Sequence, residues 1–325
     1  MILPMRMIGK NGRFTNPWAH RDHGMADILR WKLGNLLKWQ KAPAPESLTL
    51  PRCIPLDAAS LQPPTNASWR ATWLGHASFL VQSQTVSLLI DPIFSDFCAP
   101  MPLPQLRRQT APPCRVADLP KIDAVLLTHS HYDHLDIKTL RQLGMETHLI
   151  TPQGHARWLA KKGFCNVVEI PWNGTYTINE QVTITATPAQ HFTARSLWDR
   201  DLGHWCGWLI QDAHCKLWHA GDSGYCPAFR EIGERHGPID LGMIPIGAYN
   251  PRDIMQAMHM NPEEAVDAFV ESGCRKAVAM HWGTFQLTDE PIGEPPLRLS
   301  VALEARNIAA ETFSAGHIGQ SWELT

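Results

Sequence analysis

The densest group of chemically capable side chains lies in residues 128–136, which read Thr-His-Ser-His-Tyr-Asp-His-Leu-Asp. His129 and His131 are two residues apart, so in an extended segment both side chains point to one side and can share a metal ion. Asp133 and His134 lie past the turn, within reach of a second metal position. Three imidazoles and one carboxylate suit zinc or a similar metal. The alternative is that these are four solvated polar residues in a loop. Without a cation to join them, side chains packed this closely would repel or desolvate one another.

The elements around this segment predict how it is held. Residues 124–127 have the apolar pattern of a strand, and Asp136 is a plausible N-cap for a helix over 137–143. Three further ligand-type residues also follow predicted strands: His191 after Val182–Thr187, Asp222 after Lys216–His219 and His281 after Lys276–Met280. A lone histidine is more often a hydrogen-bonded core residue than a ligand. Seven ligand-type residues at strand ends of one polarity instead predict one metal centre.

From Trp69 onward, short apolar or β-branched runs alternate with glycine or proline turns and with helical segments. The other predicted strands are Ala71–Trp73, Ser78–Gln82, Ser87–Ile90, His148–Thr151, Val167–Ile170, Gly207–Ile210 and Leu241–Ile244. The other predicted helices are Gly154–Lys162, Pro227–His236, Pro262–Glu271 and Pro296–Arg306. This mixture indicates an α/β or α+β chain with two sheets covered by helices on their outer faces.

The first 65 residues stand apart, because proline-rich stretches punctuate them and only Ala26–Trp39 has a helical pattern. We therefore expect an N-terminal extension over 1–65 and a main domain over 66–325. The amphipathic helix is expected to pack on the main domain. The alternative is an interfacial helix that meets lipid.

Composition excludes several classes of protein. The 325 residues carry 29 Lys and Arg against 31 Asp and Glu, a net charge of −2, so a nucleic-acid groove is not expected. None of the eight cysteines forms a Cys-x-x-Cys pair, which favours free thiols in a reducing compartment. The start lacks an apolar stretch of signal-peptide length, and no run of 18 apolar residues occurs. A cytoplasmic protein is expected. The alternative is a location peripheral to the inner face of the membrane.

Taken together, these motifs resemble the metallo-β-lactamase superfamily and, more narrowly, the N-acyl-phosphatidylethanolamine-hydrolysing phospholipase D family in a bacterial-type form. The strings that carry the resemblance begin at Gly12–Trp18 and include Trp73–Ala77, Asp91–Phe94, Thr128–Asp136, Pro188–His191, Ala220–Phe229, Ile244–Tyr249, Pro262–Ala265 and His281–Phe285. The resemblance implies a four-layer αββα sandwich with a two-zinc site at its edge.

The resemblance also implies a role for each site residue. His129, His131 and His191 would hold one metal, Asp133, His134 and His281 the other, and Asp222 would bridge them. Asp91 would orient a ligand histidine, with His76 as a second supporting residue. The suggested catalytic residues are Asp133, which would hold the attacking hydroxide, and His259, for which a purely structural role is equally open. The candidates for substrate contact are Trp198, Trp205, Tyr249 and Trp282.

Two Zn²⁺ ions per chain, with Mn²⁺ or Fe²⁺ as alternatives, would share a bridging hydroxide and leave a cationic centre that attracts a phosphodiester. The expected activity is therefore a phosphodiesterase of phospholipase D type, acting on a small-molecule or lipid phosphodiester. A lactonase for sugar-phosphate lactones and a non-catalytic metal-binding module are the alternatives. A peripheral membrane contact and a homodimer are both compatible with the sequence.

Overall fold

Two mixed β-sheets form the centre of the molecule. The computed structural model describes residues 8–9, 11–20, 27, 30–31, 34 and 49–325. The first seven-stranded sheet has the order β14 (Ser321–Leu324), β1 (Trp69–Gly75), β2 (Ser78–Ser83), β3 (Ser87–Ile90), β4 (Ala124–Leu126), β5 (Leu149–Pro152) and β6 (Val167–Ile170). The second has the order β13 (Phe313–Ser314), β12 (Cys274–Met280), β11 (Ile239–Pro245), β10 (Lys216–His219), β9 (Gly207–Gln211), β8 (Val182–Thr187) and β7 (Thr175–Ile178).

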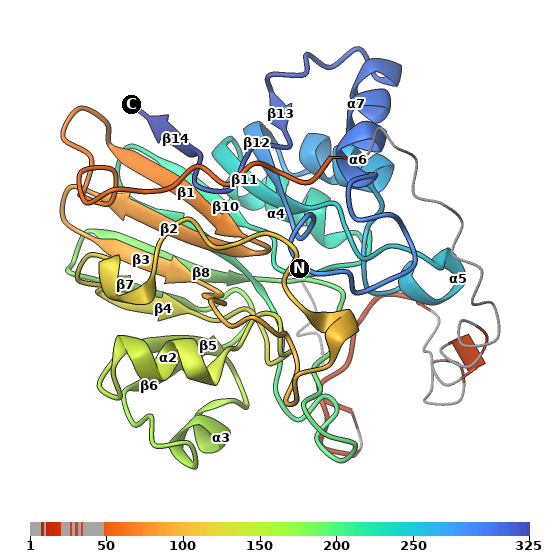
Figure 1. The fold of residues 1–325 in the computed structure, drawn as a ribbon, viewed down its shortest axis with the longest axis horizontal. Helices are drawn as coiled ribbons and strands as arrows, with labels where there is room; N and C mark the ends of the chain where they lie inside the picture. Colours follow the sequence, from red (N-terminus) through yellow and green to blue (C-terminus); the bar gives the residue numbers. More distant parts are fainter. Residues whose placement is uncertain (1–7, 10, 21–26, 28–29, 32–33, 35–48) are drawn as a thin grey trace.

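Helices cover the outer faces of both sheets. On one side of the molecule lie α2 (Ile137–Leu143) and α3 (Ala156–Ala160), and on the opposite side α4 (Ala228–His236), α6 (Pro262–Glu271) and α7 (Pro295–Ala305) (Figure 1). The short α5 (Arg252–Met255) and two 3₁₀ turns, Pro104–Leu106 and Val116–Asp118, lie in connections. The chain is therefore the predicted four-layer αββα sandwich.

The core lies between the sheets, where the inward faces of the strands meet. Strands β2, β3 and β4 are buried along their whole length, so they lack the alternation of polar and apolar residues that a half-exposed strand shows. Trp69, Trp73, Trp208 and Trp218 are among the largest fully buried side chains. Four of the chain's 13 tryptophans are therefore part of the hydrophobic core.

The predicted elements agree with the observed ones to within a few residues. The sequence patterns did not indicate β7, β13, β14 or α5. In β7, exposed and half-buried residues alternate, and β14 is an edge strand whose partner β1 lies about 250 residues earlier in the chain. The predicted helix Gly154–Lys162 is shorter, because α3 covers only Ala156–Ala160.

The described part of the N-terminal extension contacts the main domain at several points. The Trp31 indole donates a hydrogen bond to Asp289 at 2.7 Å, and Cys53 forms a parallel bridge with Ile318. Leu61 is buried in the core beneath the first sheet. Most of the predicted helix Ala26–Trp39 lies outside the described residues. The domain division at residue 65 stays a prediction.

Candidate metal centre

Three site residues occupy the first position after a strand and have left-handed backbone conformations. His76 follows β1 with φ of 53°, Asp91 follows β3 with φ of 41°, and His281 follows β12 with φ of 62°. Such values are uncommon for residues other than glycine and cost about 1–3 kcal/mol each. The surrounding sheets hold these turns in place. Their clustering at one edge of the sandwich indicates a functional site.

The first group of candidate ligands consists of three imidazoles. His129 Nε2 lies 2.8 Å from His131 Nδ1, which in turn lies 3.2 Å from His191 Nε2. His129 and His191 are buried, and His131 is half-buried. His191 reaches the other two from the loop after β8, and its Nδ1 lies 2.9 Å from the Met258 carbonyl oxygen. This contact leaves Nε2 as the nitrogen that faces the cluster.

The second group places Asp222 between both sets of histidines. Asp222 Oδ2 lies 3.0 Å from His134 Nε2 and 3.1 Å from His281 Nε2. The same oxygen lies 3.9 Å from His129 Nε2 and 3.8 Å from His191 Nε2. The structure therefore brings all seven predicted ligands together: His129, His131, Asp133, His134, His191, Asp222 and His281. Their roles as metal ligands stay a prediction.

Asp91 and His76, to which the resemblance assigned supporting roles, both contact members of the cluster. Asp91 Oδ2 accepts a hydrogen bond from His134 Nδ1 at 2.7 Å. Thr128 fixes the same carboxylate by donating to it from its backbone N–H, at 2.7 Å, and from its hydroxyl. His76 Nε2 lies 2.9 Å from Asp133 Oδ2. Asp91 thereby fixes the tautomer and direction of the His134 ring, and His76 restrains the Asp133 carboxylate.

The donor set fits divalent metal ions. His134 Nε2 and His281 Nε2 are buried and lack a hydrogen-bond partner within the described chain, although Asp222 Oδ2 lies close to both. Ring nitrogens that converge without hydrogen-bond geometry are the arrangement expected of atoms that share a cation. Four groups of His and Asp ligand atoms within 4.8 Å of one another occur in the described residues, all at this edge.

The charges of the metal-free cluster are strongly coupled. Burial alone would lower the pKa of His281, but the Asp222 and Asp133 carboxylates raise it to about 9. Burial alone would raise the pKa of Asp222, but His134 and His281 hold it well below its usual range. Burial and the neighbouring imidazoles lower the pKa of His129 well below its usual value. The site therefore favours ionised carboxylates together with neutral imidazoles on the His129 side, which is the protonation state that metal binding needs.

His259 belongs to this site rather than to a remote part of the core. A ligand atom of His259 lies within 4.8 Å of ligand atoms of His191 and Asp222, and its Nδ1 is buried without a partner in the described chain. Burial lowers the pKa of this ring to about 3, so it is neutral near pH 7. A neutral imidazole can accept or donate a hydrogen bond to a bound substrate.

Arg195 supports the histidine-rich loop, a role that the sequence patterns did not indicate. Its Nη1 donates to the carbonyl oxygens of Ser130 at 2.7 Å and Leu135 at 2.9 Å. Its guanidinium also stacks on the ring of Tyr132, 3.9 Å from the centroid. These partners lie about 60 residues earlier in the chain, and a single arginine in a loop carries no motif that would reveal them.

The four candidates for substrate contact differ in exposure. Trp198 is 80% exposed, so its indole is accessible to a ligand from solvent. Tyr249 is fully buried and its hydroxyl donates to Glu294 at 2.6 Å, so the prediction that it faces substrate is wrong. Trp282 packs against Trp73 in the core with 5% exposure, which makes the same prediction wrong there. Trp205 is 2% exposed and its indole donates to the Ala189 carbonyl, so it can offer only an edge to a ligand.

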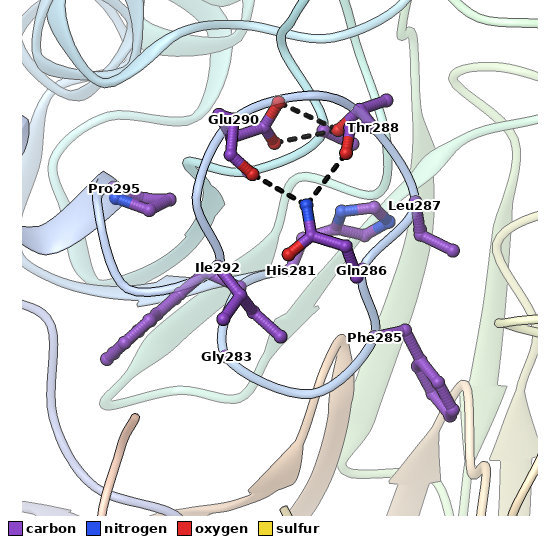
Figure 2. Close-up of a pocket in the computed structure, with 12 residues that line it drawn as sticks. His281, Gly283, Phe285, Gln286, Leu287, Thr288, Glu290, Ile292 and Pro295 are labelled. Atoms are coloured by element: carbon purple, nitrogen blue, oxygen red, sulfur yellow. Dashed lines mark hydrogen bonds between the residues drawn. The ribbon is translucent and has the colours of Figure 1, made fainter. Parts of the chain in front are cut away.

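Two cavities adjoin the cluster on different sides. Figure 2 shows the smaller one behind His281, where Gln286 Nε2 donates to the carbonyls of Thr288 and Glu290. This cavity encloses only about 10 Å³, which is room for about one water molecule. The larger one, about 310 Å³, lies beside His191 and is lined by N-terminal residues together with Trp205 and Met258. Substrate therefore has room on the His191 side.

Comparison with known proteins agrees with this geometry. The family described as "Beta-lactamase superfamily domain" matches residues 87–282. A metallo hydrolase from the archaeon Ignicoccus hospitalis shares the fold, with a TM-score of 0.61 at 22% identity over 79% of this chain and 99% of its own. The chain belongs to the metallo-β-lactamase superfamily and is, by class, a metal-dependent hydrolase.

Curated relatives narrow the assignment. An N-acyl-phosphatidylethanolamine-hydrolyzing phospholipase D of Caenorhabditis elegans is 34% identical over 269 residues, which cover 78% of this chain and 76% of that protein. A metal-dependent hydrolase of Caldivirga maquilingensis is 30% identical over 223 residues, or 67% of this chain and 85% of its own. Within the superfamily, the chain belongs to the N-acyl-phosphatidylethanolamine-hydrolysing phospholipase D family, which confirms the resemblance seen in the sequence.

All eight cysteines are free, as predicted. In the described part of the chain, no helix combines the length and the apolar character needed to cross a membrane.

Proposed function

We propose that the protein is a dinuclear zinc phosphodiesterase that cleaves lipid or glycerophosphodiesters in the manner of a phospholipase D. The observation that carries the proposal is the position of Asp222 Oδ2, within 4 Å of ring nitrogens from both histidine groups. A carboxylate shared between two ligand sets would hold two ions close together, and a pair of neighbouring ions is what two-metal hydrolysis of phosphate esters uses. The named activity of the nematode relative supports the same reaction class.

The chain's own residues would perform distinct tasks. One ion would be held by His129, His131 and His191 and the other by Asp133, His134 and His281, with Asp222 shared. When bound, two such ions polarise a phosphoryl oxygen and lower the pKa of a water.

Around that centre, His76 holds Asp133 in place, so that the Asp133 carboxylate can orient the attacking water and accept its proton. His259, which is neutral near pH 7, would donate a hydrogen bond from its ring N–H to the phosphate or to the leaving-group oxygen. Arg195 keeps the histidine loop in register.

A substrate panel tests the reaction class. We expect zinc-loaded protein to hydrolyse bis-p-nitrophenyl phosphate, glycerophosphodiesters and N-acyl-phosphatidylethanolamine, and to leave sugar-phosphate lactones intact. The measurement is product formation run beside metal analysis of the same sample. Hydrolysis of the lactones alone would instead identify a lactonase. Two metals per chain with no turnover of any substrate would identify a non-catalytic metal-binding module.

The exposed loop tip next to the site supports a lipid substrate. Leu197 is 73% exposed and Trp198 80%, only a few residues after the candidate ligand His191. Apolar side chains so exposed gain free energy by contact with acyl chains at a membrane surface. We propose that this tip contacts the lipid from which the substrate is drawn.

Replacement of Trp198 tests this contact. We expect Trp198→Ala to raise KM for a long-chain phosphodiester by about 3- to 10-fold, because an indole that is partly buried by acyl chains contributes about 1 kcal/mol. KM for bis-p-nitrophenyl phosphate should stay unchanged. Val301→Ala, on the exposed face of α7 with 64% exposure, is the matched control. Equal changes for both substrates would remove the lipid contact from the proposal.

A further inference from the structure

We propose that Asn16 is a positioning residue for His191, and that residues 13–18 form a clamp which completes the metal centre from the N-terminal extension. The inference rests on the proposed metal site and names a residue that shapes it. Neither the motif around residues 128–136 nor the strand-end ligands point to this segment.

Asn16 holds the backbone of His191 on both sides. Its Nδ2 donates to the His191 carbonyl oxygen at 2.8 Å, and its Oδ1 accepts from the His191 N–H at 3.2 Å. The Met258 carbonyl oxygen lies 2.9 Å from Nδ1 of the same histidine. His191 lies four residues beyond the end of β8, where the sheet no longer fixes the backbone. These three contacts therefore fix the His191 backbone and ring, so that Nε2 of His191 points toward the cluster.

A stack of aromatic rings holds the clamp on the main domain. Phe14 stacks on His204, with centroids 4.4 Å apart, and His204 stacks on Trp172 at 4.3 Å. Trp18 also stacks on Trp172, with ring centroids 5.8 Å apart. Asn16 lies midway between the two rings that the segment contributes. The stack thus fixes the place of Asn16 without using its polar atoms.

The clamp also ties down the loop that follows His191. The Arg13 guanidinium donates to the carbonyl oxygens of Arg200 and, at 3.0 Å, Trp198. The Phe14 N–H donates to the Asp201 carbonyl oxygen at 2.9 Å. Phe14 and Asn16 line the 310 Å³ cavity together with His191. Residues 13–18 therefore form one wall of the cavity beside His191. They also hold the loop that begins at His191, both at that residue and at Arg200 and Asp201.

A purely structural role for residues 13–18 makes a different prediction from a positioning role. A docking segment would change the stability of the metal-free protein and leave the affinity for zinc untouched. A positioning residue changes the affinity for one of two zinc ions, because only the group with His191 depends on it. Zinc affinity measured without substrate separates these roles.

The experiment measures zinc binding to the full-length chain by competition with a fluorescent chelator. We expect Asn16→Ala to weaken one of the two zinc sites by about 10- to 100-fold, the usual cost of removing a residue that supports a ligand, and to leave the other within about twofold. The melting temperature of the metal-free protein should change little. Asn11→Ala is the matched control, because Asn11 is exposed close to the clamp and, among the described residues, its side chain accepts a hydrogen bond only from the Arg13 N–H.

A double substitution tests the link between the stack and the ligand. If the stack acts through Asn16, Phe14→Ala with Asn16→Ala should weaken zinc binding no more than Asn16→Ala alone, because coupled residues are not additive. Full additivity, or unchanged zinc affinity in Asn16→Ala, would overturn the clamp while the proposed function stands. A wild-type chain that binds zinc but turns over no substrate would overturn the function and leave the clamp intact.

Discussion

Asp222→Asn is expected to abolish hydrolysis of bis-p-nitrophenyl phosphate and to release both metal ions. The substitution keeps the shape of the side chain and removes its charge. Oδ2 of Asp222 lies close to both histidine groups, at 3.0 Å from His134 Nε2 and 3.8 Å from His191 Nε2. Without this carboxylate, neither ion would have its shared anionic ligand. We expect the loss of activity to exceed the roughly 100-fold cost of removing a supporting residue.

The charge argument predicts a second consequence of the same substitution. In the metal-free chain, Asp222 is the largest cause that raises the pKa of His281, to about 9. Removal of the carboxylate should therefore lower the pKa of His281. The NMR titration of ring protons in metal-free protein would report this shift. A pKa of His281 that is unaffected by Asp222→Asn would contradict the electrostatic description of the cluster.

Asp240→Asn is the control for Asp222→Asn. Asp240 lies in β11 of the same sheet and accepts hydrogen bonds from the Lys216 N–H and Arg275. The substitution removes the same charge from the same sheet, away from the cluster. We expect activity and metal content equal to wild type. Loss of zinc in both variants would show that net charge, rather than ligation by Asp222, controls the affinity.

Local sequence carried enough information to predict where the cluster of His and Asp side chains lies. His129, Asp222 and His281 each follow a short apolar run that is a strand in both prediction and structure. Because all these strands end at one edge of the sandwich, strand prediction alone brought distant ligands together. The spacing of the ligands within residues 128–136 needed no tertiary information. The family resemblance suggested that Asp91 orients a ligand histidine, and Asp91 Oδ2 does accept a hydrogen bond from the candidate ligand His134.

Contacts between distant segments were out of reach of a single sequence. Asn16 and His191 are 175 residues apart, and the hydrogen bonds between them depend on how an irregular segment folds back onto the sheet. Burial of aromatic residues was equally hidden. Trp198 and Trp282 both lie near ligands in the sequence, yet one is 80% exposed and the other 5%. Proximity in sequence to a ligand does not determine the direction of a side chain.

Removal of metal is expected to lower the melting temperature by about 10 °C or more. Each ion bound at about 1,000 times its Kd adds about 4 kcal/mol to stability, and 1 kcal/mol shifts the melting temperature of a domain of this size by about 2–4 °C. In the metal-free site, His134 Nε2 and His281 Nε2 lie 3.0 and 3.1 Å from Asp222 Oδ2. This carboxylate offsets only part of the stability that is lost with the ions.

The measurement is thermal unfolding, followed by circular dichroism, before and after dialysis against a chelator. Readdition of zinc should restore the original melting temperature, because the left-handed turns at His76, Asp91 and His281 are held by the sheets and not by the ions. Asp222→Asn should melt well below the zinc-loaded wild type and should not respond to chelator. A wild-type melting temperature that is insensitive to chelator, in a sample shown to have lost its zinc, would mean that the site forms without energetic help from metal.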